Sequence, residues 1–263
     1  MEDEPLTPVP PRSYLENWKK YTFEFLLLFT AVFLGFLADN IREEYSERQQ
    51  AKELARNFYD ELKSDSAIAA GKIAARIKKE KAIEYMVSFF KDSSIHLNSK
   101  ALAVNFMWAT SIRTPIIFTP RTVVLEQLKS SGTLRYFKSE ELQTQVGDLS
   151  VAIEYLRERQ QLEASVYKER IEPIMINHMD FDFQYKLFNS GGIFDRLTVF
   201  ESSQEEIPFQ LSQPEKIDRK VYVNALSYYH TNNIKSTRLI PFKAYVDVNA
   251  ALLQTLRKEY GLR

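Results

Sequence analysis

The chain has 263 residues, and its 35 basic residues balance 35 acidic ones, which excludes the clustered, uncompensated positive charge that nucleic acid requires. The absence of cysteine excludes disulfides, thiol catalysis and cysteine-ligated metal centres. Seven glycines are few for the turns of sheet-rich folds, so a mainly α fold is expected. Residues 1–12, MEDEPLTPVPPR, are acidic and then proline-rich, which predicts a disordered tail.

Residues 13–41 predict a transmembrane helix. Ser13 and Glu16 match a capping box at its start. The run FLLLFTAVFLGFLA at 25–38 is apolar on all faces, and with the residues just before it approaches the roughly 30 Å thickness of the bilayer core. Length alone also permits a buried core helix. A cleaved signal peptide is disfavoured, because acidic residues and prolines precede the run and no good cleavage site follows it.

Aromatic and basic residues flank the run where a membrane interface is expected. The expected interfacial anchors are Trp18, Lys19, Lys20 and Tyr21. Glu24 shares a helical face with three small residues, which would let two backbones approach closely in lipid: Ala31, Gly35 and Ala38. An acid near the membrane edge is costly without a partner, so this face predicts self-association of the span. The alternative is that Glu24 pairs with Lys20 at the water interface.

The charges on either side of the run indicate an orientation. Lys19 and Lys20 precede the run, whereas Asp39, Glu43 and Glu44 dilute the positive charge that follows it. The positive-inside tendency therefore favours a cytoplasmic amino terminus and an exported C-terminal domain.

Residues 42–91 predict a long juxtamembrane helix with a narrow apolar stripe, suited to a bundle or coiled coil. The stripe comprises Ala51, Ala55, Phe58, Leu62, Ala69 and Ile73. Gly71 and the SDS sequence at 64–66 are the places where a kink is expected.

Residues 92–263 predict a helical domain. A short helix is expected from the Thr119-Pro120 cap to Gly132. A longer helix follows Ser139, until Pro173 kinks or interrupts it; its stripe comprises Leu142, Val146, Leu149, Ile153, Leu156 and Val166. A last helix, roughly 241–259, is expected to bury Val246, Ala250, Leu253 and Leu256.

Residues 181–200 are predicted to form a hairpin-like insertion. Four apolar residues alternate with polar ones, and NSGG at 189–192 supplies turn chemistry; the four are Phe181, Phe183, Tyr185 and Leu187. A small β-hairpin is the favoured interpretation, and an irregular loop is the alternative.

The sequence contains no recognisable set of catalytic residues and no cofactor motif. On a strand, His178, Asp180 and Asp182 would project from one face and could hold a divalent cation, but the polar face of a hairpin is the favoured interpretation. A tyrosine-rich group is expected to pack the bundle, with a ligand groove as the alternative; it comprises Tyr222, Tyr228 and Tyr229. We therefore expect a non-enzymatic protein with no cofactor, no metal and no nucleic acid partner.

Two segments resemble a known family. EFLLLFTAVFLGFLADNIREEYSERQQAKELARNFYDELKSD at 24–65 is similar to the opening of an uncharacterised family of single-span, membrane-anchored helical proteins of Gram-negative bacteria. VLEQLKSSGTLRYFKSEELQTQVGDLSVAIEYL at 124–156 is similar to the second block of that family. The resemblance covers about half the chain. It implies a membrane-anchored helical domain in the cell envelope and brings no activity with it. Together with the orientation that the flanking charges favour, the expected location is the bacterial inner membrane with a periplasmic C-terminal domain.

Two functional hypotheses follow. The first is a membrane-anchored helical scaffold or accessory subunit that self-associates through its span and juxtamembrane helix, with the lipid bilayer, further copies and another membrane protein as partners. The second is an envelope sensor whose helical bundle binds a small ligand and signals through the single span. A pocket with convergent polar groups would favour the sensor, and a dry bundle with an extensive subunit interface would favour the scaffold.

Overall fold

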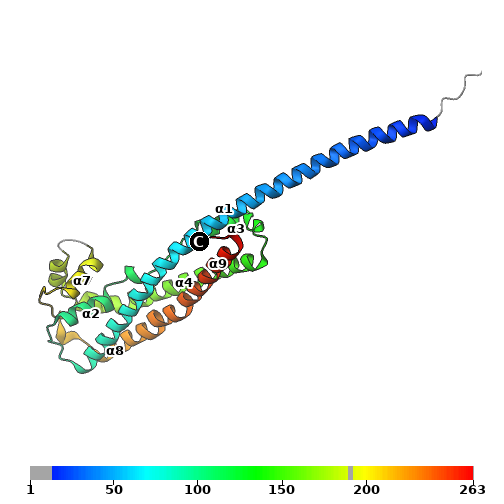
Figure 1. Ribbon diagram of the computed structural model, residues 1–263. Helices are drawn as coiled ribbons and strands as arrows, with labels where there is room; N and C mark the ends of the chain where they lie inside the picture. Colours follow the sequence, from blue (N-terminus) through cyan, green and yellow to red (C-terminus); the bar gives the residue numbers. More distant parts are fainter. Residues whose placement is uncertain (1–13, 189–191, 263) are drawn as a thin grey trace, which may run out of the picture. The chain divides into compact units, whose positions relative to one another are not determined.

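The computed structural model describes residues 14–188 and 192–262 (Figure 1). The tail predicted for 1–12 and the Ser13 cap lie outside these residues. Every regular element in the described part is helical, which confirms the mainly α fold with a long N-terminal apolar helix followed by a helical bundle. The chain divides into two compact units, Met1–Glu53 and Leu54–Arg263.

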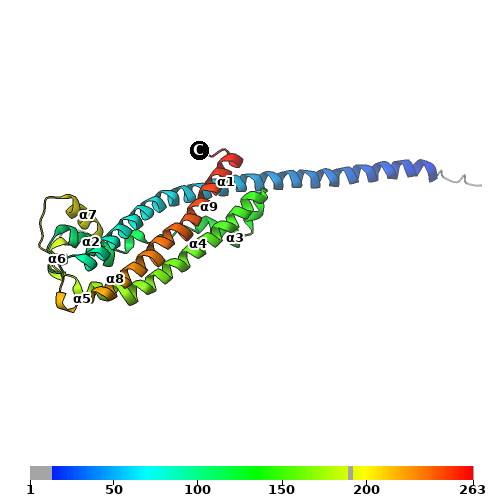
Figure 2. The same ribbon diagram turned by 90° about the horizontal axis from the view of Figure 1, so that it is seen from below.

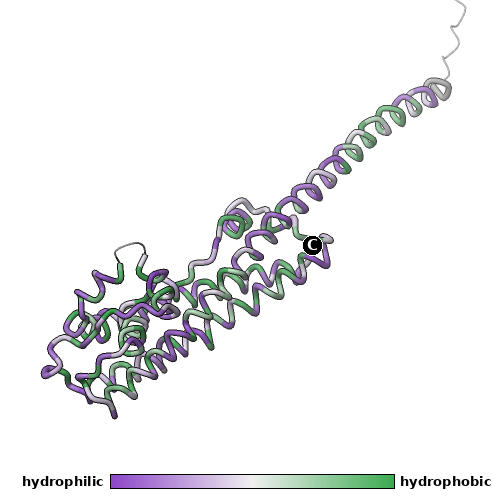
Figure 3. The backbone as a smooth tube through the Cα atoms, turned by 60° about the vertical axis from the view of Figure 1, so that its left-hand side comes forward, coloured by the Kyte–Doolittle hydropathy of each residue, from purple (hydrophilic) through white to green (hydrophobic). Residues whose placement is uncertain are grey.

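The described part of the first unit belongs to one helix, α1 (Tyr14–Asp92). No proline occurs between Tyr14 and Asp92, so no residue in this stretch lacks the backbone N–H that helix continuation needs. From Trp18 to Ser46 every side chain is exposed. Figure 3 shows the apolar positions of this part of α1 in green. The apolar run is therefore helical, and none of its residues is buried.

Three long helices lie side by side in the second unit (Figures 1 and 2). The first long helix is residues 54–92 of α1. The second long helix is continuous over α4 (Glu140–Val166), η3 (Tyr167–Ile171) and α5 (Glu172–His178). The third long helix is continuous over α8 (Arg219–Tyr228), η5 (Tyr229–Lys235), η6 (Arg238–Phe242) and α9 (Lys243–Tyr260). The segments η3, η5 and η6 are π-helical.

Shorter helices complete the second unit: α2 (Lys100–Thr110), η1 (Thr114–Ile116), α3 (Val123–Ser130), η2 (Thr133–Tyr136), α6 (Phe181–Leu187), α7 (Ile193–Ser202) and η4 (Pro214–Lys216). Ser139 caps α4 as predicted, since its hydroxyl accepts from the Leu142 amide at 3.2 Å. Gly132 follows α3 with a φ of 69°, a left-handed conformation that glycine adopts without a steric penalty. Pro173 does not end the second long helix, but the regular α-helix is interrupted just before it, as predicted: the π-helical η3 lies where the proline has no N–H to donate to the preceding turn.

The predicted apolar stripes form much of the core. Side chains of α1 and α4 that are at most 6% exposed include Ala55, Phe58, Leu62, Ala69, Leu142, Val146, Leu149, Ile153 and Leu156. Ile73 and Val166 are only partly buried. Neither Gly71 nor the SDS sequence at 64–66 interrupts α1.

The predicted inward face of the last helix was wrong at three of its four positions. Leu256 is buried, but the stripe runs one residue earlier than expected at the others, through Tyr245, Asn249 and Leu252. Asn249 is buried because its Nδ2 donates to the Leu62 carbonyl at 3.3 Å and to the Tyr245 hydroxyl at 3.0 Å. A stripe traced through apolar residues alone misses a buried asparagine that tertiary hydrogen bonds satisfy.

The β-hairpin predicted for 181–200 was also wrong, because α6 and α7 occupy this segment. Asp180 caps α6 by accepting from the Phe183 amide at 3.0 Å. Phe183 and Leu187 lie one helical turn apart and are both buried, whereas Tyr185 is exposed. Four-residue spacing therefore explains the apolar residues better than two-residue alternation. The predicted turn residues 189–191 lie outside the described part.

The helix expected to start at Thr119-Pro120 starts later, at Val123. Thr122, which precedes it, makes no capping hydrogen bond with its side chain. Two carboxylates of α1 bind the backbone of this segment instead: Asp65 accepts from the Arg121 amide at 2.8 Å and Glu61 from the Val124 amide at 3.3 Å. The first long helix thus supplies the acceptors that a local cap would otherwise provide.

Candidate functional site

All eight residues predicted to anchor or associate the span lie on α1 and are exposed. Trp18 is 67% and Tyr21 65% exposed. Steps of seven, four and three residues keep the association face within an arc of about 60° on an α-helix; this face comprises Glu24, Ala31, Gly35 and Ala38. Apart from the adjoining residues and the backbone of its own helical turns, no described atom lies within 4 Å of the position that a Gly35 Cβ would take. The association face is therefore open along the helix.

The polar side chains of the apolar run differ in their hydrogen bonding. Thr22 donates to the Trp18 carbonyl at 2.8 Å, and Thr30 donates to the Leu26 carbonyl at 2.7 Å. Such bonds satisfy the hydroxyls within the helix, as a nonpolar surrounding requires. Besides the two threonines, Glu24 is the remaining polar residue from Thr22 to Ala38. Its carboxylate makes no hydrogen bond within the helix in the described part of the chain.

A ridge of phenylalanines occupies a different side of the same helix. The ring centroids of Phe25 and Phe29 are 6.3 Å apart, as are those of Phe29 and Phe33. These positions lie about 100–180° around the axis from Glu24. The helix therefore has a bulky apolar side and a side on which three small residues lie with Leu28 and one acid.

A second cluster of functional side chains lies inside the three-helix bundle. Arg76 and Glu163 form an ion pair of 3.0 Å, with side chains 0% and 6% exposed. Arg76 also donates to the carbonyls of Ile116 at 3.1 Å and Ile234 at 3.4 Å. One guanidinium thus connects the three long helices and the η1 segment, and Ile234 belongs to the π-helical η5.

Lys79 lies one turn further along α1 and is fully buried. Its ammonium donates to three carbonyls at the carboxyl end of α2, those of Trp108 at 2.8 Å, Ala109 at 3.2 Å and Ile112 at 2.8 Å. A cation at this end also complements the helix dipole. Burial lowers the pKa of Lys79 to about 7, although the nearby Glu163 carboxylate opposes this shift. Lys79 therefore fixes the end of α2 against the first long helix.

Glu80 belongs with Arg76, Lys79 and Glu163 to a buried charge layer. Arg238 of η6 binds its carboxylate with two nitrogens, at 2.6 and 2.7 Å. Sequence reasoning missed Arg76, Lys79 and Glu80, although their spacing places them on the apolar stripe that leads to Ile83. None of these groups contacts a nucleophile or lines one of the larger cavities among the described residues, so the layer positions helices.

The His178, Asp180 and Asp182 group does not form a metal site. His178 is buried; its Nδ1 lies 2.8 Å from the Ser212 carbonyl and its Nε2 lies 2.6 Å from the Tyr222 hydroxyl. The carbonyl can only accept, so Nδ1 donates and Nε2 accepts from tyrosine. Asp180 caps α6. Over the described residues, no group of three or more His, Asp or Glu side chains is placed to hold a metal ion.

The tyrosine-rich group is divided between two environments. Tyr222 and Tyr228 line a groove of about 650 Å³ between the second long helix and α8, together with Val166 and Pro173. Tyr229 is buried in the core. Tyr229 thus packs in the core of the bundle, as expected, and Tyr222 does so only in part, because it also lines the groove.

No family model, no curated protein and no solved structure matches this chain. The resemblance to single-span proteins of Gram-negative bacteria stays a prediction. By length and composition, α1 has one segment apolar enough to cross a membrane; its best window has a mean hydropathy of 1.9, and none of that window is buried.

Proposed function

We propose that the protein is a membrane-anchored helical scaffold or accessory subunit that self-associates through its span. The observation that supports this proposal most directly is the apolar segment of α1, none of which is buried within the described chain. A core helix of the same composition would contact other elements, whereas this run exposes between 45% and 68% of each of its large side chains. Transfer of such a surface from water into lipid is strongly favourable.

Self-association is supported by the two-sided character of the segment. The phenylalanine ridge suits lipid, and the face of Ala31, Gly35 and Ala38 suits close contact with another helix. Glu24 lies on this face, where a second copy would supply a polar environment for its carboxylate. The proposed location is the bacterial inner membrane, with residues 54–263 in the periplasm.

The envelope sensor is the second candidate function. It is favoured by a cavity of about 580 Å³ among α1, residues 111–115 and the start of α7. This cavity does not require self-association of the span, so the two proposals can fail separately.

Self-association is tested on the full chain in mild detergent by light scattering during size exclusion. We expect an oligomer that Gly35→Leu converts toward monomer, because a large side chain separates the helices. Phe29→Leu, on the ridge, is the matched control and should leave the oligomer unchanged. A wild-type monomer, or equal effects of both variants, would contradict the proposal.

Orientation is tested by fusing alkaline phosphatase, which is active only outside the cytoplasm, after residue 263. We expect an active fusion. An inactive fusion at normal expression would reverse the orientation and leave the anchor itself intact.

A further inference from the structure

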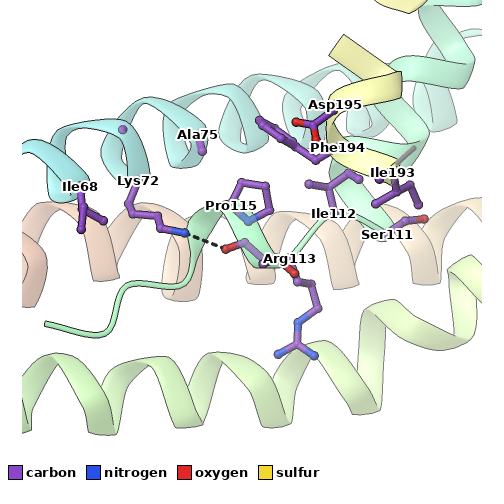
Figure 4. Close-up of a pocket in the computed structure, with 13 residues that line it drawn as sticks. Ile68, Lys72, Ala75, Ser111, Ile112, Arg113, Pro115, Ile193, Phe194 and Asp195 are labelled. Atoms are coloured by element: carbon purple, nitrogen blue, oxygen red, sulfur yellow. Dashed lines mark hydrogen bonds between the residues drawn. The ribbon is translucent and has the colours of Figure 1, made fainter. Parts of the chain in front are cut away.

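The cavity of about 580 Å³ has the size of a small-molecule site (Figure 4). One wall is the middle of α1, another is residues 111–115, and the third is the first turn of α7. Its apolar lining is formed by Ile68, Ala75, Ile112, Pro115, Ile193 and Phe194. Such a lining would bind an apolar body of limited size, and the charged groups decide what that body carries.

Lys72 is one of two cations in this lining, and neither Lys72 nor Arg113 forms an ion pair within the described part of the chain. Lys72 Nζ donates to the Thr114 carbonyl at 3.1 Å. This bond, drawn dashed in Figure 4, holds the ammonium at the wall that residues 111–115 form. An ammonium has three donors, so two remain for a ligand.

The other two charged residues of the lining are Asp195 and Arg113. Asp195 lies in the first turn of α7, where the helix dipole favours a negative charge; its Oδ2 is 3.6 Å from the position of a Gly192 Cβ. Arg113 extends away from Lys72 in Figure 4, and its Cζ lies 4.3 Å from the centroid of the Tyr167 ring. The cavity therefore offers the Lys72 cation beside an apolar surface, with the Asp195 carboxylate at the α7 end of the lining.

We propose that this cavity binds a small monocarboxylate with an apolar body. The carboxylate would accept from Lys72 Nζ, and the body would contact Ile112 and Phe194. Charge-assisted hydrogen bonds are stronger than neutral ones, so the charge gives selectivity and the apolar contact gives affinity. The site rests on the second candidate function, for which it names the class of ligand.

The first experiment compares a charged probe with its neutral counterpart. Phenylbutyrate and phenylbutyramide are titrated by calorimetry into the full chain in lipid nanodiscs, with empty nanodiscs as the blank. We expect phenylbutyrate to bind about tenfold more tightly than the amide. Lys72→Met, which keeps the apolar stem, should remove that difference. No binding, or equal affinities for the two probes in the wild type, would overturn the proposal.

The second experiment uses two helical glycines as a matched pair. Gly71 lines the cavity and Gly147 lies on α4 outside it. Apart from the adjoining residues and the backbone of its own helix, neither has a described atom within 4 Å of the position of a Cβ. Leucine favours a helix over glycine, so both variants should fold. Gly71→Leu should weaken phenylbutyrate binding about tenfold by filling the cavity, and Gly147→Leu should leave it unchanged. Equal affinities of these variants would overturn the site, while membrane anchoring and self-association would stand.

Discussion

Glu163→Leu should destabilise the bundle strongly, because it leaves the buried Arg76 guanidinium without its carboxylate. The two side chains are 0% and 6% exposed, and 3.0 Å separates Arg76 Nη1 from Glu163 Oε2. Removing one partner of a buried pair costs about 3–5 kcal/mol of unfolding free energy. Glu163 also favours the charged form of Lys79, so we expect the upper half of that range.

The assay is urea unfolding of the full chain in nanodiscs, followed by the fluorescence of Trp108, which is 1% exposed. A Trp18→Phe background removes the second tryptophan of the chain. Glu154→Leu on α4 is the matched control: its 2.7 Å pair with Arg157 is more than half exposed on both sides and contributes under about 1 kcal/mol. Equal effects of Glu163→Leu and Glu154→Leu would refute the reasoning.

The double variant Arg76→Met with Glu163→Leu separates the charge from the loss of packing. Replacing both members of a buried pair by apolar groups is often neutral or stabilising. We therefore expect the double variant to recover most of the stability that Glu163→Leu loses. A double variant no more stable than Glu163→Leu would mean that the charge left unpaired is not the cause of the loss.

Three further predictions use the same urea assay. The folded chain releases the Lys79 proton near pH 7 and the unfolded chain near 10.5, so the unfolding free energy should rise by about 2 kcal/mol from pH 7 to 9. Lys79→Met should abolish that rise. An equal rise of the unfolding free energy in the wild type and in Lys79→Met would show that the carbonyls keep Lys79 charged. Burial raises the pKa values of Glu61 and Asp65, so the folded state holds these protons at higher pH than the unfolded state, and these two carboxyl groups should add stability as the pH falls toward their unfolded values of 4.5 and 3.8. Asp65→Asn should flatten this increase, and an unchanged slope would contradict it. Tyr222→Phe removes the donor to His178 Nε2 and should cost about 1 kcal/mol, whereas an unchanged stability would make that hydrogen bond dispensable.

Much of the fold follows from periodicity. Ala55, Phe58 and Leu62 recur at helical steps and are buried, and Ser139 caps the helix that it precedes. These features depend on neighbours within one or two turns, which a sequence displays directly.

The charge layer could not be predicted in the same way. Arg76, Lys79 and Glu80 occupy stripe positions, but their partners lie in other elements: Glu163, the carbonyls of α2, and Arg238. A charged residue on an apolar stripe is buried only when the fold supplies such partners. A local pattern contains no information about them.

The segment 181–187 shows a different limit. Its apolar residues fit both a two-residue and a four-residue period, so the pattern alone does not choose between strand and helix. The Asp180 cap decides in favour of the helix. The association face of the span stays a prediction, since its partner belongs to a second molecule or to lipid.

The most direct test of the central claim, that the apolar segment of α1 lies in lipid, is cysteine labelling in isolated membranes. The chain has no cysteine, so single substitutions need no background variant. Val32 and Gln50 are both exposed on α1. In permeabilised membranes a water-soluble maleimide should label Gln50→Cys rapidly and Val32→Cys only after detergent is added. Equal labelling of both without detergent would place the segment in water and contradict the account.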